Sequence, residues 1–165
     1  MKDSVIVYHG GTQIVESPLC KFGRRNLDFG QGFYVTDIRQ QAVDWAIKKG
    51  AITQERPLLN RYLLKRELFI AEGRSLVFKA YDSEWFDFIV ASRMEQNPSA
   101  GYDYIEGGVA NDRVIDSINL YLQGFLTRDI ALQRLAEHQP NNQMCLLNQC
   151  LTDKYLIFDG TEELY

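Results

Sequence analysis

The segment Phe29-Gly30-Gln31-Gly32-Phe33-Tyr34-Val35-Thr36 decides between the fold classes open to this chain. Its first glycines match the start of a dinucleotide-binding fingerprint, in which three spaced glycines follow a strand and open a helix. Here Val35 occupies the third glycine position, and the glycines precede a strand-like run instead of following one. The chain also lacks a Gly-Lys-Ser/Thr phosphate-binding loop. We therefore expect no doubly wound nucleotide-binding fold.

The rest of the sequence alternates short apolar runs with helical patterns, without regular strand–helix–strand units. Strands are predicted at residues 4–8, 32–36, 58–67, 76–79, 102–106, 143–147 and 155–158, and helices at 38–49, from Ser83, at 114–122 and from Thr127. This irregular order predicts an α+β fold with small, split or bent β-sheets and flanking helices. Asp37 is expected to cap the helix at 38–49, with Ala42, Trp45, Ala46 and Lys49 along one face, and Gly50 is expected to end it.

Composition narrows the class of protein. The 165 residues, 45% of them hydrophobic, predict one domain spanning residues 1–165. The net charge of −4 argues against a general nucleic-acid binder. Three irregularly spaced cysteines, Cys20, Cys145 and Cys150, are interpreted as structural thiols rather than a disulfide framework or a zinc site. With no signal-peptide pattern and no long apolar stretch, we expect a cytoplasmic protein that makes no use of a membrane or a metal.

Three residues stand out as candidates for binding. His9 ends the first predicted strand beside Gly10 and Gly11, where a ligand can approach the backbone closely. Tyr34 lies in the second predicted strand, and Trp45 follows it after ten intervening residues. Each residue alone is more typical of a structural role than of a binding site. The three in combination favour a binding site.

The combination resembles the ADP-ribosyltransferase superfamily, in its diphtheria-toxin-like and poly-ADP-ribose-polymerase-like branch. The matching segments are Tyr8-His9-Gly10-Gly11, Gly32-Phe33-Tyr34-Val35-Thr36 and Ala42-Val43-Asp44-Trp45-Ala46. The runs at 102–114 and 142–146 are similar to a family of short bacterial proteins catalogued within this superfamily as a domain of unknown function. That family often stands beside a small partner gene. The resemblance extends from about residue 4 to residue 159.

The resemblance implies an NAD-dependent mono-ADP-ribosyltransferase, and a toxin of a toxin–antitoxin pair is one form of it. His9 would bind the adenosine-side ribose of NAD, and the backbone at Gly10 would anchor the nicotinamide amide. Tyr34 and Trp45 would sandwich the cationic nicotinamide ring, an attraction of about 0.5–2 kcal/mol beyond the buried area. The implied partners are NAD, a macromolecular acceptor, more readily a protein than a nucleic acid, and a small antitoxin protein.

The third motif departs from the family pattern. Active members place Glu near the start of a late strand, and the matching residue here is Gln143. Glutamine can bind a ribose hydroxyl, but it can act neither as a base nor as a negative charge. Asp112 and Glu106 are the alternative carboxylates, and Arg113 is a candidate phosphate ligand. A helix-capping role for Asp112 and solvated positions for Arg24, Arg25 and Arg113 are the structural alternatives.

Two other functions remain open at this point. Gln143 in place of Glu favours a catalytically weak module that binds or senses NAD, or that binds another protein, on the same fold. NAD hydrolysis with water as the acceptor is the third alternative.

Overall fold

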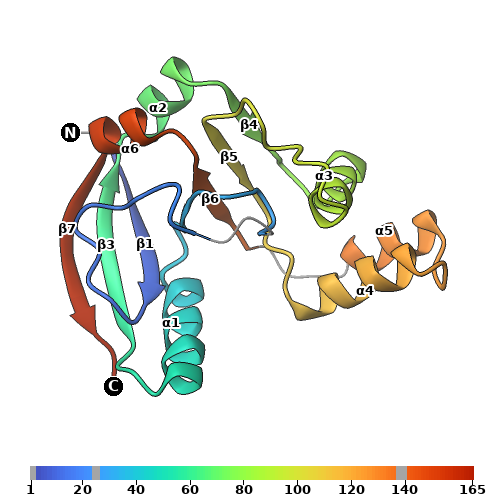
Figure 1. The fold of residues 1–165 in the computed structure, drawn as a ribbon, viewed down its shortest axis with the longest axis horizontal. Coiled ribbons are helices and arrows are strands. Elements are labelled where there is room, and N and C mark those ends of the chain that lie inside the picture. The colour runs from blue at the N-terminus through green and yellow to red at the C-terminus, as the bar shows by residue number, and fades with distance from the viewer. Residues whose placement is uncertain (1–2, 24–26, 137–140) are drawn as a thin grey trace.

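Two small β-sheets form the framework of the computed structural model, which describes residues 3–23, 27–136 and 141–165 (Figure 1). The first sheet has the strand order β1-β3-β7 and the second has the order β2-β6-β5-β4. The strands are β1 (Val5–Gly11), β2 (Phe33–Val35), β3 (Leu58–Leu64), β4 (Ser75–Val77), β5 (Tyr104–Gly107), β6 (Gln143–Leu146) and β7 (Leu156–Glu163). All neighbouring strands are antiparallel except the parallel pair β4–β5. The α+β fold with small split sheets is therefore confirmed.

Six helices within the described residues cover these sheets. They are α1 (Arg39–Thr53), α2 (Arg66–Glu72), α3 (Ser83–Arg93), α4 (Asp112–Leu122), α5 (Arg128–Ala136) and α6 (Gln149–Tyr155). None of the helices in this described part of the chain is long and apolar enough to cross a membrane.

The two sheets meet at the edges of β1 and β2. Tyr8 and Thr36 exchange a pair of backbone hydrogen bonds, with N···O distances of 2.8 and 3.0 Å. A core of side chains from both sheets fills the space between them, and Val7, Phe33, Tyr62, Tyr104 and Leu146 belong to it. The residue after β2 is thereby fixed against the middle of β1.

The other face of the second sheet is covered by α3, α4 and α5 (Figure 1). As the sequence predicts, Trp85, Phe86, Phe88 and Ile89 of α3 are buried in this second core. Cys145 of β6 packs there too, whereas its neighbours along the strand face the first core. Side chains alternate between the two faces of β6, so Gln143 and Cys145 lie on the same face.

Helix α1 packs against β1 and β3, and it differs from the prediction at three points. Ile38 occupies the N-cap position, so Asp37 is not the cap. Gly50 lies inside the helix, and a Cβ there would come within 2.8 Å of the carbonyl oxygen of Glu55. The helix ends instead at Gln54, whose φ of 57° is left-handed. Trp45 is 58% exposed and does not share the buried face.

Candidate functional site

His9 is held in one tautomer at the junction of the sheets. Its Nδ1 lies 2.8 Å from the carbonyl oxygen of Tyr34. A carbonyl can only accept, so Nδ1 carries the proton and Nε2 carries a lone pair. The ring stacks on Phe33, with ring centres 4.5 Å apart. Burial and then the charge of Lys49 lower the pKa of His9, against the opposing bond to Tyr34, and the imidazole is therefore mostly neutral at pH 7.

Gly10 has a packing reason to be glycine. A Cβ at this position would lie 2.0 Å from the backbone oxygen of Ala42 and 3.1 Å from the nitrogen of Ala46, both in α1. The close approach of β1 to α1 therefore requires a residue without a side chain. Anchoring of a ligand amide by Gly10 stays a prediction.

Tyr34 is fixed by the loop that precedes β2. Its hydroxyl donates to the carbonyl oxygen of Gly30 at 2.6 Å and accepts the N–H of Phe29 at 3.1 Å. Burial raises the pKa of Tyr34 well above its ordinary value. The hydroxyl is therefore neutral, and both of its hydrogen bonds go to the loop. These bonds fix the orientation of the ring. No aromatic contact joins Tyr34 to Trp45 among the described residues.

Gln143 forms a hydrogen-bonded pair with a carboxylate that the sequence did not bring forward. Its Nε2 donates to Oδ2 of Asp28 at 2.9 Å and to the carbonyl oxygen of Gly108 at 3.4 Å. The same Oδ2 accepts the N–H of Ala110 at 2.9 Å. Burial raises the pKa of Asp28, although these two donors and the charge of Arg93 oppose it.

Asp112 and Arg113 lie apart from this pair. Asn111 is the N-cap of α4, since its side chain accepts the N–H of Val114 at 3.1 Å, so Asp112 is not the cap. Asp112 forms an exposed ion pair with Lys48 of α1 at 3.5 Å. Arg113 is exposed. The structure therefore places both at the start of α4, with no hydrogen bond to Gln143 among the described contacts.

Glu106 is engaged in the interior rather than presented to a ligand. Its Oε2 accepts from Nε of Arg66 at 2.8 Å and from the hydroxyl of Tyr104 at 2.6 Å, and its Oε1 accepts from Asn142 at 3.1 Å. This bonding is that of a structural ion pair between the two sheets. Arg24 and Arg25 lie outside the described residues.

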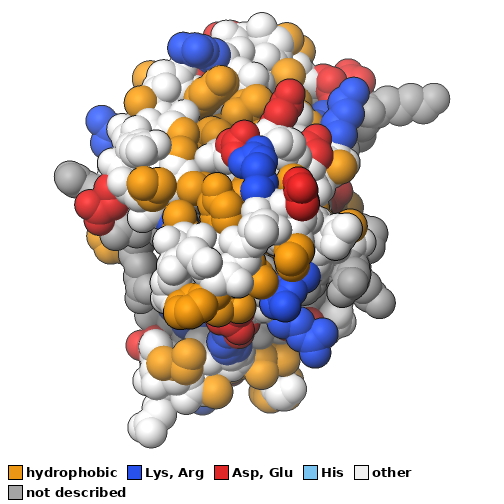
Figure 2. Space-filling model, turned by 90° about the vertical axis from the view of Figure 1, so that its right-hand side faces the viewer, with side chains coloured by type: hydrophobic (Ala, Val, Ile, Leu, Met, Phe, Trp, Pro, Cys, Tyr) orange, Lys and Arg blue, Asp and Glu red, His pale blue; other side chains and the backbone are white. Residues whose placement is uncertain are grey.

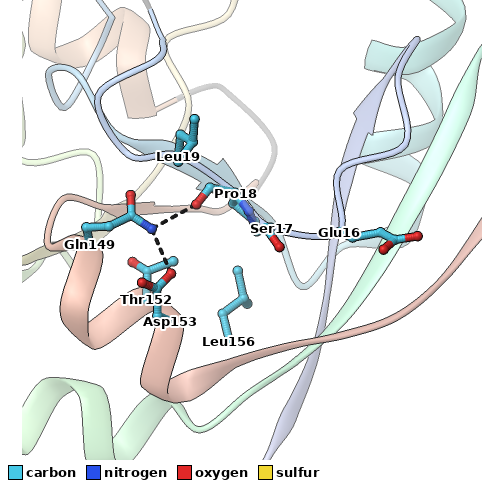
Figure 3. A pocket seen from close by; sticks show the side chains of 8 residues that line it. All are labelled: Glu16, Ser17, Pro18, Leu19, Gln149, Thr152, Asp153 and Leu156. Atoms are coloured by element: carbon cyan, nitrogen blue, oxygen red, sulfur yellow. Dashed lines mark hydrogen bonds between the residues drawn. The ribbon is translucent and has the colours of Figure 1, made fainter.

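A cavity of about 470 Å³ lies elsewhere, between the loop after β1 and α6 (Figure 3). Its lining residues are Glu16, Ser17, Pro18, Leu19, Gln149, Thr152, Asp153 and Leu156. The amide nitrogen of Gln149 already donates across it to the carbonyl oxygen of Pro18, and also to Asp153 of the same helix. None of the sequence-predicted site residues lines this cavity. In the described ranges, no three His, Cys, Asp or Glu side chains are grouped to hold a metal ion.

Comparison with known proteins identifies the family. The family model DUF3990, described as a protein of unknown function, matches residues 5–158. The chain belongs to this family. No curated protein and no solved structure matches the chain. The expected membership in a family of unknown function is confirmed, and the match says nothing of an activity.

In this DUF3990 chain the structure brings together three of the sequence-predicted residues. Tyr34 and Gln143 occupy the same face of neighbouring strands, because Tyr34 pairs with Cys145 and Cys145 shares the face of Gln143. His9 bonds to the backbone carbonyl of Tyr34, and its ring stacks on Phe33, whose side chain lies on the opposite face of β2 from that of Tyr34. Asp28 adds a carboxylate that sequence analysis missed, since a single aspartate inside the long segment 13–31 forms no motif.

Proposed function

We propose that this protein binds NAD and transfers its ADP-ribosyl group to a macromolecule. The observation that carries the proposal is the bond from His9 to the carbonyl group of Tyr34. It joins the first two motifs of the resemblance and fixes a neutral imidazole whose Nε2 can accept a hydrogen bond from a ribose hydroxyl. The ring of Tyr34 is held in place by the segment at Phe29 and Gly30.

The proposed reaction is a glycosyl transfer. The bond between nicotinamide nitrogen and ribose C1′ breaks, and its electron pair leaves with neutral nicotinamide. The acceptor forms a new bond to C1′ through an oxocarbenium-like transition state, and its proton passes to solvent. Gln143 can orient the ribose as a hydrogen-bond acceptor but cannot take that proton. We therefore expect slow transfer unless the acceptor is a good nucleophile.

Tryptophan fluorescence offers a direct binding test. The chain has two tryptophans, the exposed Trp45 and the fully buried Trp85. NAD bound next to Trp45 should quench the emission of wild type, and Trp45→Phe, which leaves only Trp85, should lose the quenching. Equal quenching in both proteins would place any bound NAD away from Trp45. His9→Phe keeps a ring against Phe33 but removes both nitrogens, and it should weaken NAD binding by about tenfold, the value of one good hydrogen bond.

Turnover is then measured as nicotinamide released with and without cell lysate. Release that requires lysate, with a labelled macromolecule, supports transfer. Release matched by free ADP-ribose and no labelled product would mean NAD hydrolysis instead. The exposed Phe22, which is 86% accessible, supplies a control variant, Phe22→Ala.

A catalytically weak NAD-binding module is the second candidate, and the bonding of Gln143 favours it. A neutral amide tied to Asp28 occupies the third motif, so no charge faces a developing oxocarbenium ion directly. This candidate predicts NAD binding without release of nicotinamide in any lysate.

The net charge of −4 and the one face drawn in Figure 2 favour a protein as the acceptor over a nucleic acid. Figure 2 shows the side of the molecule at the right of Figure 1, where acidic and basic side chains are interspersed with apolar ones. A nucleic-acid acceptor calls for a continuous basic stripe.

A toxin role, with a small antitoxin partner, predicts growth arrest when the chain is expressed alone and relief by His9→Phe.

A further inference from the structure

The Gln143 amide has only one favourable orientation. Its NH2 group faces two acceptors, the carboxylate of Asp28 and the carbonyl group of Gly108. If the amide were rotated by half a turn, Oε1 would face those two acceptors and both hydrogen bonds would be lost. The neighbours of Gln143 therefore assign the positions of Nε2 and Oε1.

Asp28 is itself held firmly from two other segments. The N–H of Ala110, after β5, donates to the same carboxylate oxygen at 2.9 Å. The hydroxyl of Ser92, in α3, donates to the backbone carbonyl of Asp28 at 3.0 Å. Both the backbone and the carboxylate of Asp28 are thus fixed before any ligand arrives.

The opposite end of the amide remains available. Fully enclosed side-chain nitrogen and oxygen atoms all have hydrogen-bond partners in the described residues. The hydrogen bonds of the Gln143 side chain to described residues all use Nε2, so none of those residues engages Oε1. An acceptor with a fixed direction, on the face that also holds Tyr34, suits a ligand hydroxyl.

We propose that Asp28 is a positioning residue, which fixes the Gln143 amide so that Oε1 is presented as a hydrogen-bond acceptor to a ribose hydroxyl of the substrate. The inference rests on the proposed function for the identity of the ribose. The orientation of Gln143 rests on the protein contacts alone, so the two parts can be tested separately.

The first experiment follows the side-chain NH2 signals of Gln143 by NMR as pH changes. The titratable or charged groups near Asp28 are Arg93 of α3, Tyr34 of β2, Tyr81 before α3 and Cys145 of β6. Burial raises the pKa of Tyr81 to about 12 and holds those of Tyr34 and Cys145 above their ordinary values. A titration in the acidic to neutral range that disappears in Asp28→Asn therefore belongs to Asp28, whereas a titration of His9, whose pKa is lowered, would persist in that variant.

We expect the Gln143 signals to follow that titration in wild type and to lose it in Asp28→Asn. Asp116→Asn, which removes an exposed carboxylate of α4, is the matched control and should leave the titration unchanged. Gln143 signals that ignore pH in wild type would overturn the proposed orientation, even if nicotinamide release showed that the proposed function holds.

The second experiment is a double-mutant cycle on nicotinamide release. Asp28→Ala should lower kcat/KM by about thirtyfold, and Asp28→Asn should lower it less, because its Oδ1 can still accept from Gln143. In the Gln143→Ala background, where no amide remains to be oriented, neither change should matter further. Equal losses in both backgrounds would show that Asp28 acts independently of Gln143 and would overturn the inference.

Folding is checked by circular dichroism, and Asp28→Asn carries the cycle if Asp28→Ala does not fold. Wild type that neither binds NAD nor releases nicotinamide would overturn the proposed function and the substrate part of this inference together. The NMR titration would in that case still decide whether Asp28 orients Gln143.

Discussion

Of the two adjacent glycines at the end of β1, only the first is too close to its neighbours to carry a side chain. Gly10 approaches the backbone of α1 so closely that a Cβ would lie 2.0 Å from the oxygen of Ala42. A Cβ on Gly11 would make only an ordinary contact, 3.6 Å from Nε2 of His9. We expect Gly10→Ala to lower the free energy of unfolding by about 3 kcal/mol, because α1 must move, and Gly11→Ala to change it by less than about 1 kcal/mol. Urea denaturation of both variants measures the difference, and equal losses would contradict the packing argument.

Asp28 should make the stability depend on pH in a defined direction. Burial raises the pKa of its carboxyl above the usual 3.8, so the folded state binds the proton more tightly than the unfolded state. The contribution of the protonated carboxyl is therefore fully present below pH 3.8 and is lost as pH rises through the folded-state pKa. The stability of wild type relative to Asp28→Asn should therefore fall as the pH rises above about 4 in urea unfolding. A difference that rises over this range would show that hydrogen bonding outweighs desolvation.

At the residue scale, sequence reasoning found candidate residues that stand in short motifs and missed one that is marked only by a contact between distant parts of the chain. His9 and Tyr34 were predicted as partners in a site, and their hydrogen bond joins them. Asp28 bonds to Gln143 across 115 positions of the chain, and no local pattern marks it. Trp45 illustrates the reverse error, since the helix was assigned correctly but its buried face holds Val43 and Gly50 in place of the predicted Trp45.

At the scale of elements, Asn142 fastens the start of β6 to α1. Its carbonyl group accepts from the side chains of Gln41 and Thr36, each at 2.7 Å, and its N–H donates to Gln41 at 3.2 Å. We expect Gln41→Ala to cost about 1–2 kcal/mol in the free energy of unfolding, because both backbone groups of Asn142 lose a partner. The neighbouring Gln40 donates only to the exposed Asp44 on the same helix, at 2.8 Å, so Gln40→Ala should cost less than about 0.5 kcal/mol. Chemical denaturation of the two variants tests this, and hydrogen exchange of β6 amides should accelerate only in Gln41→Ala.

The elements that sequence analysis found are those with strong local signals. Helix α3 was predicted because a run of aromatic residues follows helical spacing, but its N-cap is Asp82, which accepts the N–H of Trp85 at 3.0 Å, and not the predicted Ser83. Helices α2 and α6 were missed, since each has seven residues and their start lies next to a strand-like apolar run. Gly50 was read as a helix end, whereas the close approach of the segment at Glu55 makes it an internal packing residue.

At the scale of the whole molecule, the pairing of strands cannot be predicted from local sequence patterns. The sheets have the orders β1-β3-β7 and β2-β6-β5-β4, so each combines strands from distant parts of the chain. Small split sheets could be predicted from the irregular order of elements, but their strand order follows from which apolar faces close the shared core. The site depends on that closure, because His9 comes from one sheet and Gln143 from the other.

The ion pair between Arg66 and Glu106 should be one of the contacts that hold the two sheets together. Arg66 begins α2 directly after β3 of the first sheet, and Glu106 lies in β5 of the second, with a shortest distance of 2.7 Å. The side chains are only 22% and 10% exposed. Arg66→Met should therefore lower the free energy of unfolding by about 3–5 kcal/mol, because it leaves a buried carboxylate without its partner. Arg61→Met is the matched control, since Arg61 of β3 pairs with Asp159 at the surface, and it should cost less than about 1 kcal/mol.

A second variant separates this structural role from a catalytic one. If the loss in Arg66→Met comes from the unpaired charge, adding Glu106→Gln should recover more than half of it, because the buried group is then neutral. The amide of Gln at position 106 can still hydrogen-bond to Tyr104 and Asn142, which both reach the carboxylate now. Nicotinamide release, where it is detectable, should return with stability in the double variant. A double variant that is stable but inactive would instead make Glu106 the carboxylate that the third motif lacks, and the ion pair with Arg66 the means of holding it ionised.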